Sequence, residues 1–505
     1  MFRYQKKVVG LVCSILIIAM LAGCSQGNEG STAPFRDDII IAINADISNL
    51  DPRNTADSSD FRMFELIFSS LVRQSEGGGF APSIAQSWEM ASDGLSYTFI
   101  LRDDVRFHNG DLLTARDVVF SFERAMESPF VGAGLIPIAS VTAVNGHTVR
   151  FDLHDQFAPF ISSIQPIWIV SESVIAAAGD DAGREPIGTG PYMFVERQPG
   201  RSIDLTRFDD YFGGPAPIRD VTWMVIISPA TASIAIEAGD VDLALMVLPG
   251  EVENLAANEG LYANINLTTA VNFLTISMHA EPFDNPLVRE VVARTIDRDA
   301  IITVVAEGLG EPARGFLNEL SFGYSPDVTL FDRDVDMAKE LLAEAGFPDG
   351  FATSIQTIGG TFESIAQVTQ LNLAEIGITA TIEVLDQAVA IGNMLTHNYE
   401  IGILAAAMPG IDANGWSDLF VTGGGLNFGG HSDPDIDRWF NEARIATDPA
   451  ARIEIYRQIA QRVNDTASFI PIYFNSLAYI HNSALEMGFV GPTGNFRVDT
   501  MRWVD

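Results

Sequence analysis

Only two cysteines occur in this 505-residue chain, and both lie near its amino terminus. Cys13 sits inside an apolar run, and Cys24 ends the tetrapeptide Leu-Ala-Gly-Cys that closes that run. A thiol can act as a nucleophile, a metal ligand, half of a disulfide or the attachment point of a lipid. Because no thiol follows residue 24, the remaining chain offers no cysteine nucleophile, no cysteine-based zinc site and no disulfide.

The other residue types that catalyse reactions or hold metals form no recognisable set. Seven histidines are scattered along the chain, and the closest two in sequence, His147 and His154, are seven residues apart. The sequence contains no Gly-x-Ser-x-Gly motif, no Gly-x-x-x-x-Gly-Lys phosphate loop and no His-Glu-x-x-His motif. Carboxylate pairs are frequent, but a chain with 66 acidic residues produces them by chance. We therefore expect no enzymatic activity, no metal and no cofactor.

The amino terminus has the three zones of an export signal. Basic residues come first, followed by an apolar run of 15 residues, Val8 to Ala22, which is short of the ~20 that a membrane-spanning helix needs. The segment Leu21 to Cys24 resembles the lipobox of bacterial lipoproteins, which implies removal of residues 1–23 and acylation of Cys24. An ordinary signal peptide with an incidental cysteine is the alternative. Residues 24–37 would then be a flexible tether to the membrane.

Local signals predict a mixed α/β fold for the rest. Asn145-Gly146 between two strand-like runs predicts a hairpin. Thr114 and Asp117 have the spacing of a helix-capping box, and Gly346 is a candidate left-handed end of a helix. Three helix starts combine a capping residue with a proline at the first helical position, namely Asn285-Pro286, Asp433-Pro434 and Asp448-Pro449.

Four segments in order resemble one family. Residues 82–122 resemble the signature of family 5 extracellular solute-binding proteins, the peptide-, opine- and nickel-binding components of ATP-driven importers. The resemblance continues at PIGTGPY (186–192), at residues 281–301 and at NFGGHSDPDIDRW (427–439). It covers nearly all of the chain after the export signal. Most residues of these motifs are expected to serve packing and helix starts. The motifs therefore identify the family but do not locate its ligand-binding site.

This resemblance implies a two-lobed α/β fold like that of periplasmic binding proteins. Among these proteins it implies the type II fold, in the large cluster whose members carry an extra subdomain. Lobe I would comprise residues 38–270 with an inserted subdomain at about 53–186, and residues 481–505 would return to it. Lobe II would comprise residues 271–480. The ligand would lie between the lobes, which close by hinge motion. The closed monomer would dock on the permease of an ABC importer at the outer face of a bacterial membrane.

The resemblance also implies site residues. In the peptide-binding branch, an aspartate of an Asp-Pro segment pairs with the ligand's amino terminus, and here that place falls on Asp412, followed by alanine instead of proline. A solvated loop aspartate is the alternative. Trp416 and Asn427 would flank the same edge of the cleft, although Trp416 could equally be core. Ser48 and Asn49 follow the first strand, where the family's ligand loop begins.

Charge narrows the ligand class. The chain has 30 basic residues and a net charge of −36, which argues against a nucleic-acid partner. Residues 340–437 contain thirteen acids and no lysine or arginine, whereas dipeptide-binding relatives clasp the ligand carboxylate with an arginine in this lobe. We therefore expect a positive or neutral ligand, because a buried carboxylate without a partner is costly. Arginines of lobe I, such as Arg53, Arg62 and Arg73, could overturn this expectation.

The sequence thus predicts a lipid-anchored receptor for a peptide or a related amine-bearing solute. Within the same class, a nickel-chelate receptor or an oligosaccharide receptor is the alternative. An envelope chaperone that uses the same cleft for unfolded segments is an alternative from another class. A lipid-anchored hydrolase would need a nucleophile or a metal site that the motifs do not provide.

Overall fold

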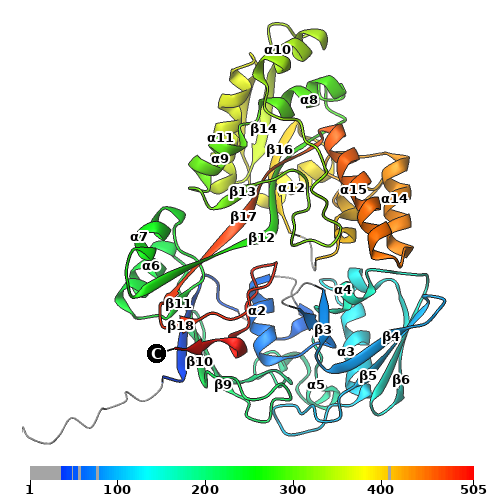
Figure 1. Cartoon of the computed structure of the whole chain (residues 1–505), viewed down its shortest axis with the longest axis vertical. Coiled ribbons are helices and arrows are strands. Elements are labelled where there is room, and N and C mark those ends of the chain that lie inside the picture. Colours follow the sequence, from blue (N-terminus) through cyan, green and yellow to red (C-terminus); the bar gives the residue numbers. More distant parts are fainter. Residues whose placement is uncertain (1–35, 48, 55–57, 76–78, 408–410, 505) are drawn as a thin grey trace, which may run out of the picture. The chain divides into compact units, whose positions relative to one another are not determined.

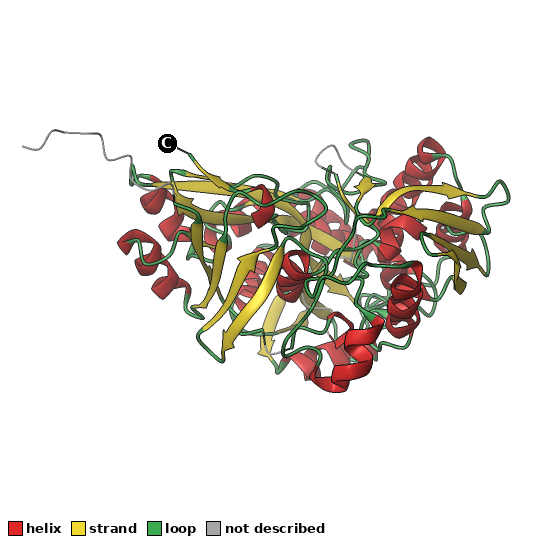
Figure 2. Ribbon diagram, turned by 90° about the horizontal axis from the view of Figure 1, so that it is seen from below, coloured by secondary structure: helices red, strands yellow, loops and turns green. Residues whose placement is uncertain are grey.

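The computed structural model describes residues 36–47, 49–54, 58–75, 79–407 and 411–504. Helices and strands alternate along these ranges, and in Figure 2 helices flank the strands of the sheets. Among the described residues, no helix combines the length and the apolar composition that crossing a bilayer requires.

Within the described residues, eleven strands form the largest sheet, in the order β15-β14-β16-β12-β17-β11-β1-β10-β9-β8, with β13 paired to β17. The long antiparallel strands β12 and β17 are shared by both halves of this sheet (Figure 1). The strands are β1 (Asp38–Ile43), β8 (Tyr192–Gln198), β9 (Ser202–Arg207), β10 (Asp220–Val225), β11 (Leu243–Ala244), β12 (Leu261–Ile276), β13 (Gly310–Pro312), β14 (Ala352–Thr357), β15 (Thr379–Val384), β16 (Ile401–Ala406) and β17 (Phe469–Asn482).

Strand β1 illustrates why these residues form a central strand. It pairs in parallel with β10 on one side and β11 on the other. Ile39, Ile41 and Ile43 point into one hydrophobic cluster, and Ala42 points into another on the opposite face. Because both faces are covered, the strand is apolar almost without interruption instead of alternating with polar residues.

A second, four-stranded antiparallel sheet has the order β4-β5-β7-β6. The predicted hairpin is confirmed, since β6 ends at Asn145 and pairs with β7, which begins at Thr148. Phe99 and Phe151 of this sheet pack edge to face and both contact Phe160, which makes an aromatic core. Its strands are Ala85–Met90 (β4), Ser96–Leu101 (β5), Ile138–Asn145 (β6) and Thr148–Leu153 (β7), and two short pairs join Val72–Gln74 (β2) to Phe80–Pro82 (β3) and Leu485–Glu486 (β18) to Arg502–Trp503 (β19).

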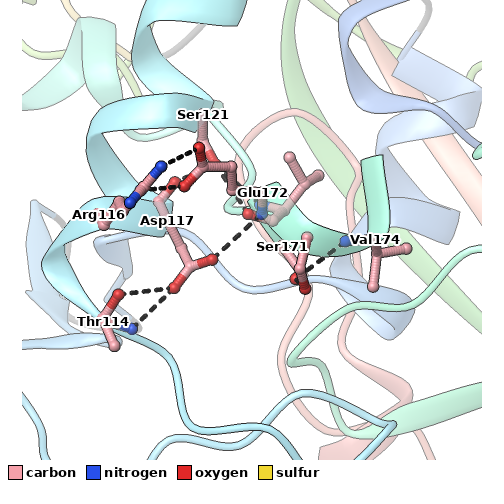
Figure 3. A network of polar contacts seen from close by, with 9 residues as sticks. Thr114, Arg116, Asp117, Ser121, Ser171, Glu172 and Val174 are labelled. Atoms are coloured by element: carbon pink, nitrogen blue, oxygen red, sulfur yellow. Dashed lines mark hydrogen bonds and ion pairs between the residues drawn. The ribbon is translucent and has the colours of Figure 1, made fainter. Parts of the chain in front are cut away.

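The predicted helix start at Thr114 is confirmed and also connects two helices (Figure 3). The Asp117 carboxylate accepts hydrogen bonds from the Thr114 backbone N–H, at 2.9 Å, and from the backbone N–H of Glu172, at 3.1 Å. Arg116 closes the network by pairing with the Glu172 carboxylate at 2.7 Å. One carboxylate therefore caps α3 (Ala115–Met126) and holds the start of α5 (Glu172–Ala178) against it.

The three predicted Asx-Pro helix starts are confirmed as well. Asn285, Asp433 and Asp448 each accept a hydrogen bond from a backbone N–H of the first turn. Gly346 has a φ of 97° just after α10, as expected for a left-handed end. The remaining helices are α2 (Ser58–Ile67), α4 (Phe160–Ile164), α6 (Pro229–Ala238), α7 (Val252–Ala256), α8 (Pro286–Thr295), α9 (Arg298–Val305), α10 (Val335–Glu344), α11 (Thr361–Ala374), α12 (Gln387–Leu395), α13 (Ser417–Phe420), α14 (Pro434–Ile445) and α15 (Pro449–Thr466).

The hydrophobic clusters divide the described chain near residue 270. Buried members of three clusters come from residues 39–255 and 478–501, and those of the other two come from residues 271–474. We call the first part lobe I and the second part lobe II. Ala478, Tyr479 and Ile480 pack in lobe I, a few residues before the expected return at 481. The four-stranded sheet lies inside the expected insertion, 53–186.

Candidate functional site

A cavity of about 480 Å³ lies between the two lobes. Its volume falls within the range of roughly 300–1,000 Å³ that is typical of small-molecule sites. Lobe I contributes the segment after β2 and the segment after β18, strand β12 contributes its middle, and lobe II contributes two loops. The lining residues are Gln74, Ser75, Gly79, Ile265, Asn266, Leu267, Glu319, Leu320, Ile411, Phe489, Val490, Gly491 and Pro492.

The walls of this cavity are mostly apolar. Among its described lining residues, Glu319 is the one charged group, and its side chain is exposed. Phe489 supplies an aromatic surface, and Gln74 and Asn266 supply amides. Such a cavity can hold an aliphatic or aromatic body and one cationic group, and it lacks a partner for an anion on its own walls.

The strands that connect the lobes are irregular where they pass from one lobe to the other. The register between β12 and β17 shifts between Leu267 and Val271 and again after Asn272. Side chains bridge the interruption: Thr268 donates to the carbonyl of Asn475 at 2.9 Å, and Asn272 donates to the Asn475 side chain at 2.7 Å. An interrupted ladder bends more easily than a regular one, which suits a hinge.

The lobes also meet at a second place, away from these strands. The backbone N–H of Ala158 in lobe I donates to the carbonyl of Arg444, the penultimate residue of α14 in lobe II, at 2.7 Å. A backbone contact of this kind forms only when the lobes approach each other. The described structure is therefore a conformation with the lobes in contact.

Asp412, the predicted partner of a ligand amine, already has a cationic partner within the chain. Arg452 Nη2 donates to both carboxylate oxygens at 2.9 Å, and only 7% of the Arg452 side chain and 11% of the Asp412 side chain are exposed. Asp412 Oδ1 also accepts from the backbone N–H of Asn414 and from the Tyr456 hydroxyl. Oδ2 accepts only from Arg452 among the described residues, so it retains a lone pair for a further donor.

Arg452 is fixed from several sides. Its Nε donates to the carbonyl of Ala443 at 3.0 Å, and its guanidinium lies over the ring of Phe322, 4.6 Å from the centroid. Burial raises the pKa of Tyr456 well above its usual value, and the Asp412 carboxylate raises it further, so the hydroxyl stays protonated. The network thus joins the segment of Asp412 to the end of α14, beside the interlobe contact at Arg444.

Trp416 and Asn427 are both buried in lobe II. The Trp416 side chain is only 4% exposed and packs on Phe316 and Phe420, so the packing favours its core role. The amide nitrogen of Asn427 donates to the carbonyls of Val421 and His431, and its oxygen accepts from the His431 backbone N–H. Asn427 therefore holds the loop before α14, and a ligand role for either residue stays a prediction.

Of the predicted lobe I residues, only Asn49 is described. It is exposed, and its side-chain oxygen accepts from the backbone N–H of Asp51 at 2.9 Å. Asp51 in turn pairs with Arg124 of α3, at 2.6 Å from Nη1, which fixes the segment that follows β1. Ser48 and Cys24 lie outside the described residues.

In the folded chain, arginines from other segments of lobe II pair with acids of the stretch 340–437. Arg462 pairs with Asp433 at 2.7 Å, and Arg333 pairs with Glu375 at 2.8 Å, besides the pair made by Arg452. Three acids of the stretch, Glu375, Asp412 and Asp433, are therefore compensated by arginines from outside it. Arginines just outside the stretch reach into it because the chain folds back on itself.

Two histidines that are distant in sequence meet in lobe II. The ring centroids of His279 and His397 are 4.8 Å apart, and His397 Nδ1 is hydrogen-bonded to the carbonyl of Phe428 at 3.0 Å. A metal site needs more ligands than one such pair provides. In the part of the chain that the structure describes, no group of three or more His, Cys, Asp or Glu side chains is placed to hold a metal ion.

Several lining residues of the cavity escaped the sequence analysis. Glu319 and Phe489 belong to segments with no motif of their own, and Gln74 lies on a three-residue strand. The sequence signal that comes nearest is the expected return of residues 481–505 to lobe I, which brings Phe489 to the cavity.

An α/β fold of two lobes with a cavity between them is the arrangement expected of a solute-binding receptor, and comparisons with known proteins show the family. The family model of "Bacterial extracellular solute-binding proteins, family 5 Middle" matches residues 79–428. The glutathione-binding protein GsiB of Pectobacterium atrosepticum is 26% identical over 489 residues, covering 93% of this chain and 95% of its own. This chain belongs to family 5 of the bacterial extracellular solute-binding proteins.

Solved structures show the same two-lobed fold. The substrate-binding protein CtaP of Listeria monocytogenes matches with a TM-score of 0.86 at 23% identity, over 93% of this chain and 100% of that one. The protein DppA of Helicobacter pylori, in complex with peptide STSA, matches with a TM-score of 0.80 at 25% identity, over 93% and 99%. The protein is thus the substrate-binding receptor of an ABC importer and not an enzyme, and its relatives work in the periplasm or outside the cell.

Proposed function

We propose that the protein is a lipid-anchored receptor that binds a peptide or a related amine-bearing solute and delivers it, as a monomer, to an ABC permease. The observation that carries the ligand class is the cavity of about 480 Å³ between the lobes, with Glu319 as the charged group on its described walls. Asp412 is not a lining residue but follows the lining residue Ile411, and its Oδ2 accepts only from Arg452 among the described residues, so an ammonium would find an acceptor there.

Closure over the solute would use the interrupted strands β12 and β17 as the hinge. The hydrogen bond between Ala158 and Arg444 is one contact that the closed form gains. The permease would then recognise the closed arrangement of the lobes. The expected lobe boundaries, 38–270 and 271–480, remain part of this proposal.

Mass spectrometry of the native protein, purified from its own host without added ligands, tests the ligand class. We expect a co-purified solute of peptide-like mass that carries an amine and is released when the protein is denatured. A matched sample that was unfolded, washed and refolded should carry none. Recovery of a nickel chelate or an oligosaccharide would replace the amine-bearing solute, and recovery of unfolded polypeptides would favour a chaperone.

The anchor is tested by replacing Cys24 with serine. Serine cannot take the thioether-linked lipid, so the variant should move from the membrane fraction to the soluble fraction, because the anchor rests on acyl chains. Cys13→Ser is the matched control, since this cysteine lies inside the expected signal and should leave membrane retention unchanged. Membrane retention of the Cys24→Ser variant equal to that of the parent would rule out the lipid anchor.

A further inference from the structure

A second, smaller pocket lies in lobe I and adjoins the cavity between the lobes. Its volume is about 50 Å³, and the two share Gln74 and Phe489 as lining residues. Helix α2, strand β2, the segment after α4 and the segment after β18 form its walls. We call it the lobe I pocket.

Unlike the larger cavity, the lobe I pocket has polar side chains that lack partners. Trp168 is 7% exposed, and its indole N–H has no hydrogen-bond acceptor among the described residues. Gln165 is 8% exposed and lines the same pocket, where no described residue bonds its side-chain amide. Native structures rarely leave a buried donor such as the Trp168 N–H unsatisfied.

Two arginines line the pocket, and one of them is already paired within the chain. Arg497 donates from Nε to Asp499 at 3.0 Å, so these two charges balance. Burial raises the pKa of Glu65 to about 7, while Arg497 and Arg62 lower it and Asp499 raises it. Arg73 also lines the pocket; it is exposed to solvent and has no hydrogen bond or ion pair with any described residue.

We propose that the lobe I pocket is a subsite for a carboxylate, or an anionic group of similar size, at one end of the bound solute. The guanidinium of Arg73 and the Gln165 amide would donate to its oxygens. The volume has room for about three or four water-sized groups, which matches a carboxylate and the carbon that bears it. This inference rests on the proposed function, because it assigns one end of the same solute.

The subsite changes the expected ligand. An amine near Glu319 or Asp412 and a carboxylate near Arg73 would make the solute a zwitterion, such as a peptide with both ends free. The sequence argued against such a ligand because lobe II lacks a basic residue over 340–437. Arg73 supplies that charge from lobe I.

The test uses a mixture of random tripeptides with free carboxylates, and the matching mixture of C-terminal amides. Each is incubated with the delipidated receptor, passed over a gel-filtration column and quantified by mass spectrometry of the retained peptide. The receptor should retain the acids about 10- to 100-fold more strongly than the amides, which corresponds to one charge-assisted contact. Arg73→Gln should reduce this preference to about one.

Arg201→Gln is the matched control, because this arginine of lobe I is exposed and lies outside both cavities. It should keep the preference of the parent protein. Equal retention of acids and amides by the parent would overturn the subsite and leave the proposed function standing. Stronger retention of amides would also overturn it, since the pocket would then hold a neutral or cationic group. Retention of neither mixture would overturn the peptide-like ligand and the subsite together.

Glu65 provides a second readout of the same pocket. Because its pKa is about 7, its carboxylate becomes charged between pH 6 and pH 8 and then opposes a bound carboxylate. The preference for acids over amides should therefore fall as the pH rises through this range, and Glu65→Gln should abolish the fall. A preference that stays constant with pH in the parent would contradict the placement of the carboxylate beside Glu65. Arg497, Asp499 and Arg62 act electrostatically on Glu65, and Arg73 and Tyr211 line the same pocket.

Discussion

Replacement of Arg452 by methionine is expected to lower the free energy of unfolding by about 3–5 kcal/mol, the usual range when one partner of a buried ion pair is removed. The variant leaves the Asp412 carboxylate, 11% exposed, without the two hydrogen bonds from Arg452 Nη2. It also removes the bond from Nε to the carbonyl of Ala443. Urea unfolding followed by circular dichroism would measure the difference.

Arg457→Met in the same helix is the matched control. Arg457 pairs with Glu454 at the surface, at 2.8 Å, and such exposed pairs contribute less than about 1 kcal/mol. Adding Asp412→Leu to Arg452→Met should recover part of the lost stability, because no unpaired charge then remains buried. A loss below about 1 kcal/mol for Arg452→Met alone would show that the pair does not stabilise lobe II.

Asp412→Asn is expected to weaken an amine-bearing ligand by roughly 10- to 100-fold, the equivalent of one charge-assisted hydrogen bond. The reason is the lone pair that Asp412 Oδ2 keeps beside Arg452, which an ammonium can use. Isothermal calorimetry with the solute recovered from the native protein would measure the affinity. The N-acetylated form of that solute has no ammonium, so its affinity should change little.

Two comparisons separate this effect from a general disturbance of lobe II. Asp418→Asn removes the same charge from an exposed position six residues away and should leave both affinities unchanged. If Asp412→Asn weakened the amine and the N-acetylated solute equally, the loss would come from the broken Arg452 pair. Asp412 would then be a structural residue only.

Local features of the fold could be predicted well from the sequence. The helix starts at Asn285, Asp433 and Asp448 and the hairpin at Asn145-Gly146 are confirmed, because each depends on hydrogen bonds between residues a few positions apart. The family could also be predicted, since its motifs are continuous segments such as residues 82–122, and the family model matches 79–428.

The site required the tertiary structure. Arg452 reaches Asp412 across 40 positions, and the lobe I pocket brings Glu65, Arg73 and Trp168 together with Arg497 from the far end of the chain. Neither arrangement can be predicted from the spacing of the residues in the sequence. The packing of the helices, and the pairing of the carboxyl-terminal segment with lobe I, decide which side chains meet. By itself, the sequence determined the elements, the fold class and the receptor family. Only the tertiary structure decided which charges are compensated and which remain for a ligand, since that depends on distances between side chains that the chain order does not set.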